Sequence, residues 1–164
     1  MTRSEFNRCV DNFADGIYRF VLKNIRDEEK SRDIVQETFT RVWMKVDKVP
    51  FQKGKSYLFT TAYHTMIDWI RKDERQTPIE DKHMHVGASF NSYSDVAEVL
   101  DEALKQLAEI QRTVVLLRDY EGYAYNEIGE ITGLSETQVK VYIFRARQFL
   151  KQYIQSLDTV LEER

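Results

Sequence analysis

The sequence YNEIGEITGLSETQVKVYIFRARQFL (Tyr125–Leu150) has the pattern of a short helix, a turn and a longer helix. Gly133 supplies the turn, because glycine adopts a left-handed conformation without steric cost. Ser135 and Gln138 have the spacing of a capping box, which begins the second helix. The inward-facing apolar residues of the pair are Ile128, Leu134, Val139 and Ile143. Together these features are typical of a DNA-binding helix-turn-helix.

The longer helix carries cations on the face that its apolar residues leave free. If Val139, Ile143 and Ala146 face inward, the opposite face can enter the major groove of DNA. Lysine and arginine there can bond guanine edges or phosphates, and Val141 and Phe144 can touch thymine methyl groups. The alternative is a solvated charged face. The residues that we expect to contact DNA are Thr137, Gln138, Lys140, Val141, Phe144, Arg145 and Arg147.

The composition of the whole chain favours an all-α protein. Only six glycines and two prolines occur among 164 residues, which leaves few signals for β-hairpin turns. The single Cys9 excludes an internal disulfide and suits a reducing compartment. The sequence has neither an apolar run of membrane-spanning length nor the apolar core of a signal peptide. We therefore expect a cytoplasmic protein that is not inserted in a membrane.

Periodic and non-periodic segments divide the chain into two parts. Apolar residues recur at helical spacing over three segments, at 4–25, 27–46 and 56–72. Residues 73–95 show no periodicity and collect polar and turn-forming residues. Amphipathic helices resume near Ser94 and continue into the helix-turn-helix. We predict two small helical domains, residues 1–76 and 96–158, joined by a flexible linker at residues 77–95.

Charge is distributed unevenly along the chain. The net charge of −3 argues mildly against a protein that binds bare DNA. Residues 1–76 hold 15 basic and 12 acidic residues, whereas the rest of the chain is net acidic. The acidic segments could meet a basic partner or restrain binding to free DNA.

Two surfaces of the first domain allow more than one interpretation. The helix expected at 27–46 has a polar side that would ordinarily be a solvated face. The helix expected at 56–72 holds four aromatic residues that do not share one stripe. They can pack in the core, or they can stack on unpaired bases while nearby cations follow the nucleic-acid backbone. These aromatic residues are Tyr57, Phe59, Tyr63 and Trp69.

The sequence offers little support for an enzyme. It has no glycine-rich phosphate loop, no Cys-x-x-Cys pair and no nucleophile elbow. His83 and His85 have no carboxylate or thiolate company that would indicate a metal site. We therefore expect no catalytic residues, no metal and no cofactor.

Two motifs in a fixed order resemble one protein family. The segments DIVQETFTRVW (Asp33–Trp43) and YLFTTAYHTMIDWIRKDER (Tyr57–Arg75) resemble the −10-reading domain of bacterial sigma factors. The segment Leu100–Leu150 is similar to their −35-reading domain. The chain length and the two-domain plan resemble the small extracytoplasmic-function type.

The resemblance implies a transcription initiation factor that binds core RNA polymerase, directs it to promoter DNA and helps to melt that DNA. It implies that one helix docks on the clamp helices of the largest polymerase subunit, through Asp33, Gln36, Glu37, Thr40 and Arg41. It implies that the following helix binds the −10 element, through Tyr63, His64, Asp68, Trp69, Arg71 and Lys72. An anti-sigma factor is a further expected partner.

Three residues depart from the family pattern. His64 replaces the usual asparagine, which affects the expected −10 base preference. Ala124 replaces a polar N-cap, a loss of about 1 kcal/mol. Gly129 replaces alanine, at a cost of about 1 kcal/mol in helix propensity, although it also lies where the two helices should approach closely. We therefore expect the second domain to be marginally stable by itself.

Two other classes of protein remain open from the residues alone. The first is a helix-turn-helix regulator whose N-terminal domain senses a signal or dimerises. The second is a helical interaction protein, which the turn, the cap and the basic helix together disfavour. A sensing domain should offer a ligand pocket, whereas residues 1–76 offer polar and aromatic surfaces.

Overall fold

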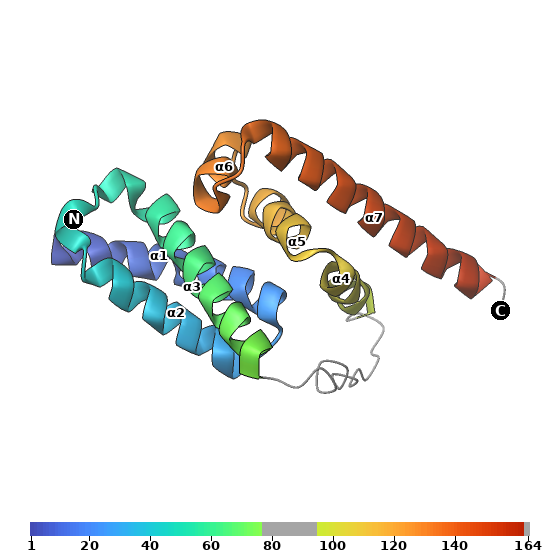
Figure 1. Cartoon of the computed structure of the whole chain (residues 1–164), viewed down its shortest axis with the longest axis horizontal. Coiled ribbons are helices and arrows are strands. Elements are labelled where there is room, and N and C mark those ends of the chain that lie inside the picture. The colour runs from blue at the N-terminus through green and yellow to red at the C-terminus, as the bar shows by residue number, and fades with distance from the viewer. Residues whose placement is uncertain (77–94, 163–164) are drawn as a thin grey trace.

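The computed structural model describes residues 1–76 and 95–162, and every regular element in these two ranges is a helix (Figure 1). This confirms the predicted all-α class. The predicted linker lies outside the described residues, except for Asp95. None of the helices in the described ranges combines the length and apolar character needed to cross a membrane. The α-helices are α1 (Arg3–Ile25), α2 (Glu28–Trp43), α3 (Gly54–Gln76), α4 (Asp95–Gln106), α5 (Glu109–Val115), α6 (Tyr125–Thr132) and α7 (Glu136–Glu162).

The helices α1, α2 and α3 pack on one another around a buried apolar centre. Thr2 begins α1 with a capping box, because its hydroxyl accepts from Glu5 N and its own N–H donates to the Glu5 carboxylate. Asp27 caps α2 through the backbone N–H of Lys30. Burying each large aliphatic side chain here contributes roughly 1.5–3 kcal/mol. The centre includes Ile17, Phe20, Ile34, Val42, Leu58, Ala62 and Met66.

The connection between α2 and α3 differs from the prediction. The helix expected to reach residue 46 ends at Trp43, and two short 3-10 turns follow at Val46–Lys48 and Phe51–Lys53. The turns allow Val49 to be almost fully buried, and its extended backbone is the conformation favoured before proline. The Trp43 side chain was expected on the apolar stripe, but it is 44% exposed and lies against only the ring of Phe6 among the described aromatic residues.

The second group of helices contains the predicted helix-turn-helix. Gly133 ends α6 in the left-handed conformation, with φ of 79°. Ser135 and Gln138 form the predicted reciprocal capping bonds, at 3.0 and 3.1 Å. Val96, expected on the apolar stripe of α4, is 70% exposed because it lies in the first turn of that helix, ahead of its buried residues. The buried residues of the motif are Ile128, Ile131, Val139, Ile143 and Ala146.

The two unusual residues of α6 have local explanations. The N–H of Ala124 donates to the Glu127 carboxylate at 3.0 Å, which is the half of a capping box that an alanine permits. A Cβ atom at Gly129 would lie 2.8 Å from the carbonyl oxygen of Leu134 in the turn. This agrees with the close approach expected at Gly129, and the turn leaves no space for the methyl group of the alanine that is usual in the family.

The two groups of helices lie directly against each other (Figure 1). The ring of Tyr123, which follows the π-turn Leu116–Tyr120, packs edge-on against Phe59 of α3 at 5.2 Å between centroids. The Nε and Nη2 groups of Arg19 donate to the two carboxylate oxygens of Glu121, at 2.9 and 3.0 Å. The buried residues of both groups therefore form one continuous core.

The close approach at Gly129 predicts the effect of adding one methyl group. Gly129→Ala should gain about 1 kcal/mol in helix propensity. It should lose more than that, roughly 1–3 kcal/mol, because the Leu134 carbonyl must move to admit the Cβ atom. We expect a net decrease in the free energy of unfolding, measured by urea titration of the whole chain.

Asn126→Ala is the matched control, since Asn126 is exposed on the same helix. It should leave the free energy of unfolding unchanged or slightly higher. A Gly129→Ala chain as stable as the unsubstituted chain would contradict the steric argument.

Candidate nucleic-acid interface

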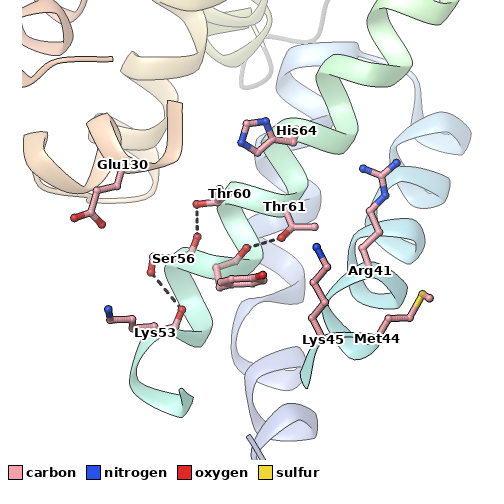
Figure 2. A pocket seen from close by; sticks show the side chains of 10 residues that line it. Arg41, Met44, Lys45, Lys53, Ser56, Thr60, Thr61, His64 and Glu130 are labelled. Atoms are coloured by element: carbon pink, nitrogen blue, oxygen red, sulfur yellow. Dashed lines mark hydrogen bonds between the residues drawn. The ribbon is translucent and has the colours of Figure 1, made fainter. Parts of the chain in front are cut away.

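A groove of about 680 Å³ runs along the outer side of α3, and we call it the α3 groove. Its walls come from the end of α2, the connection before α3 and α3 itself, and α6 of the second group supplies one rim residue (Figure 2). The groove combines three cations, three hydroxyls, an aromatic ring and an imidazole. It is lined by Arg41, Met44, Lys45, Lys53, Ser56, Tyr57, Thr60, Thr61, His64 and Glu130.

Helical spacing places the polar side chains of α3 in this groove. Ser56, Thr60 and His64 follow one another at steps of four, so they lie on one face of the helix. The Thr60 hydroxyl donates to the carbonyl of Ser56 at 2.7 Å, and the Thr61 hydroxyl donates to the carbonyl of Tyr57 at 2.8 Å (Figure 2). Each hydroxyl oxygen keeps acceptor capacity for a ligand. Such a surface suits a sugar-phosphate backbone and its bases.

The predicted −10 residues are distributed around α3 and do not form one cluster. Of the six, only His64 lines the α3 groove. Tyr63 is half-buried, and burial, with a smaller effect of Glu109, raises the pKa of its phenol. Asp68, Trp69 and Lys72 line a second groove, of about 340 Å³, between α2 and α3. The sixth residue, Arg71, is exposed, as is Lys72.

The sequence interpretation missed most of the α3 groove. Lys45 and Lys53 lie in the connection before α3, where the sequence has no periodicity that would orient them. Ser56, Thr60 and Thr61 share a helical face with His64, and this spacing was a usable signal. The remaining missed residues of the groove are Met44 and Glu130, whereas Tyr57 is one of the aromatic residues that the sequence offered for base stacking.

The five predicted polymerase-binding residues lie along one face of α2. Their positions follow the steps of three and four that define a helical face. Asp33, Gln36 and Thr40 are exposed. Glu37 and Arg41 are half-buried because their side chains reach across to α3.

The predicted −35 residues all lie on the exposed side of α7. Phe144 is 62% exposed and Val141 is 40% exposed, while their neighbours Val139 and Ile143 are buried as predicted. The Lys140 amino group lies 3.5 Å from the Glu136 carboxylate. Arg147 differs from the others, because its guanidinium is bound at two points by Asp119, at 2.5 and 3.0 Å.

Clusters of metal-binding side chains are not found among the described residues. The two histidines considered in the sequence, His83 and His85, lie outside them.

Comparisons with known proteins agree with this arrangement. The Sigma-70 region 2 family matches residues 9–76, and the Sigma-70 region 4 family matches residues 92–150. SigM, an ECF RNA polymerase sigma factor of Bacillus subtilis, is 30% identical over 146 residues, which cover 85% of this chain and 88% of SigM. SigV of the same organism is 26% identical over 92% of this chain and 91% of its own length.

Two solved structures share the fold. The sigma factor RpoE in complex with the anti-sigma factor NepR, from Bartonella quintana, superposes with a TM-score of 0.79 at 22% identity, over 92% of this chain and 96% of RpoE. CnrH in complex with the cytosolic domain of CnrY superposes with a TM-score of 0.73 at 20% identity, over 94% of this chain and 90% of the matched chain. With two sigma regions in order and a relative matched over nearly its whole length, this chain belongs to the extracytoplasmic-function (ECF) family of RNA polymerase sigma factors.

Proposed function

We propose that this sigma factor binds core RNA polymerase, directs it to promoters through their −10 and −35 elements, and helps to hold the melted DNA strand. The observation that supports this most directly is the pair of DNA-suited surfaces on one chain. One is the α3 groove, and the other is the exposed face of α7 around Phe144. A chain with two such surfaces, and a polar face on α2 beside the first, fits an initiation factor in the cytoplasm.

We assign the first surface to the −10 element and to polymerase. Residues 1–76 then form the domain that docks on the largest-subunit clamp helices through α2 and binds the −10 strand along α3. The cations of the α3 groove would contact phosphates, and His64 would contact a base. Residues 77–95 join this domain to the second one.

We assign the second surface, in residues 96–158, to the −35 element. Lys140 and Arg145 are exposed on α7 beside Val141 and Phe144, which is the combination needed for guanine edges and thymine methyl groups. Arg147 differs, because Asp119 already holds its guanidinium, so a contact of Arg147 with DNA would use the N–H donors that Asp119 leaves free.

We also propose an anti-sigma factor as a partner of this chain. RpoE was solved with the anti-sigma factor NepR, and its chain superposes on nearly all of this one. The alternative, a regulator with a sensing domain, has less support, because the α3 groove is open and lined by cations and hydroxyls (Figure 2). A sensor for a small molecule would favour an enclosed, mostly apolar pocket.

In vitro transcription tests the proposed function. Core polymerase with this chain should initiate from DNA upstream of its own gene, and core polymerase alone should not. The chain should also co-purify with core polymerase. Failure to co-purify, together with no transcripts from any such template, would exclude the sigma function.

Substitutions in α7 test the −35 assignment. Lys140→Ala or Arg145→Ala should each weaken promoter use by about 1–3 kcal/mol, because a base contact is lost. The measurement is transcription from promoters with intact and scrambled −35 elements. Gln148→Ala, at another exposed position of α7, is the control and should have no effect. Unchanged −35 dependence in both cationic variants would remove these residues from the recognition surface.

His64→Asn tests the −10 assignment. An imidazole and an amide present different donors and acceptors to a base. We expect the preferred base at one −10 position to change, with a discrimination of about 1–3 kcal/mol, while −35 dependence stays the same. Transcription from a template pool randomised across the −10 element measures this. An unchanged preference at every position would show that His64 does not contact a base.

A further inference from the structure

A chain of polar contacts joins α2 to α3 behind the α3 groove. Glu37 of α2 accepts from the indole N–H of Trp69 at 2.7 Å through one oxygen, and from Arg41 at 2.6 Å through the other. The same Arg41 guanidinium lies 3.4 Å from the Asp68 carboxylate of α3. Two carboxylates therefore hold one guanidinium. We call these four residues the α2–α3 seam.

Arg41 occupies a position shared by two sites. It lines the α3 groove, and it also lines the second groove together with Glu37 and Asp68. Its guanidinium is turned away from Met44, along α2 (Figure 2). In the free chain its charge is thus neutralised by the seam, although its side chain stands at the edge of a surface that suits DNA phosphates.

Glu37 is the acidic member of the seam that lies on the α2 face, whereas Asp68, the other acid, belongs to α3. It lies on the same face of α2 as the exposed residues Asp33, Gln36 and Thr40. Its side chain is 36% exposed, and that of Arg41 is 40% exposed. Ion pairs at such exposure contribute only about 0.2–1 kcal/mol, so a cationic side chain of a partner can exchange with Arg41.

We propose that Glu37 is a positioning residue that keeps Arg41 from the −10 strand until polymerase binds. A cationic side chain of polymerase on Glu37 releases Arg41, which then contacts a phosphate of the strand in the α3 groove. This inference rests on the proposed function, in which α2 docks on polymerase and α3 binds the −10 element. It adds a physical connection between the two events.

The connection has a reciprocal consequence. If polymerase binding strengthens strand binding by some factor, strand binding must strengthen polymerase binding by the same factor. The strength of exposed ion pairs sets this factor at about 1.4- to 5-fold. Arg41 would add one phosphate contact, which steepens the salt dependence of single-strand binding by about 0.7 in a double-logarithmic plot.

Binding of a labelled single-stranded −10 oligonucleotide to the full chain tests the proposal, with fluorescence anisotropy at several salt concentrations. Glu37→Gln keeps an oxygen that can accept from Trp69 but removes the charge that holds Arg41. We expect it to bind the oligonucleotide about 1.4- to 5-fold more tightly than the unsubstituted chain, with the steeper salt dependence. The gain should disappear in a chain that carries both Glu37→Gln and Arg41→Gln.

Glu29→Gln is the matched control for charge, because it removes one exposed acid from the first turn of the same helix. A gain of equal size in Glu29→Gln would overturn the proposal, since it would reflect net charge alone. A gain that survives Arg41→Gln would overturn it too. So would equal behaviour of Glu37→Gln and the unsubstituted chain, including no binding by either.

Trp69 gives a second and spectroscopic readout. The chain has two tryptophans, and Trp43→Phe leaves Trp69 as its only tryptophan, which can be excited selectively over the nine tyrosines. Addition of core polymerase should change Trp69 emission, because the carboxylate on its indole N–H takes a new partner, and Glu37→Gln should alter this response. Unchanged emission upon binding would overturn the proposal. Absence of polymerase binding would instead exclude the proposed function itself, so the two failures are distinguishable.

Discussion

The packing of Tyr123 against Phe59 is the contact on which the arrangement of this sigma factor depends. Tyr123 is 2% exposed, and burial raises the pKa of its phenol, so the ring stays neutral. The side chain of Glu121, two residues earlier, is only 6% exposed to solvent, and it pairs with the guanidinium of Arg19. One short segment after the π-turn thus places an aromatic ring and a paired charge on α1 and α3. It joins two helical groups into one core.

The same contact determines which surfaces remain free. The Tyr123 ring covers Phe59. It also lies beside Lys55, whose amino group is 4.6 Å from the centroid of the ring. The contact also places Glu130 of α6 at the rim of the α3 groove (Figure 2). The face of α7 around Phe144, which we propose for the −35 element, stays exposed. The polar face of α2, with the exposed residues Asp33, Gln36 and Thr40, takes no part in this contact.

Local rules predicted the helices of this chain well, and contacts distant in sequence were the difficult part. The spacing of Ser135 and Gln138 and the turn at Gly133 depend on neighbouring residues alone, and each prediction was confirmed. The close approach at Gly129 was expected, but its partner, the Leu134 carbonyl, could not be named from helix propensity alone. The α3 groove was missed for a similar reason, since Lys45 and Lys53 come from an irregular connection. The proposal that the α2 face binds polymerase comes from the resemblance to a family, since the residues alone indicated a solvated surface.

The −35 and −10 elements are separated by about 25 base pairs. The two proposed DNA-binding surfaces of the packed chain lie much closer together than that. Twenty-five base pairs of B-DNA extend about 85 Å, at 3.4 Å per step, whereas α7 in its whole length of 27 residues measures about 40 Å. With Phe59 and Tyr123 in contact, α3 and α6 are neighbours, and the α3 groove and the start of α7 are separated by little more than one helix. Under the proposed function, a chain bound at both elements must therefore separate at the contact between Tyr123 and Phe59. Under the proposed function, binding to polymerase would then have to offset the free energy lost when this contact separates.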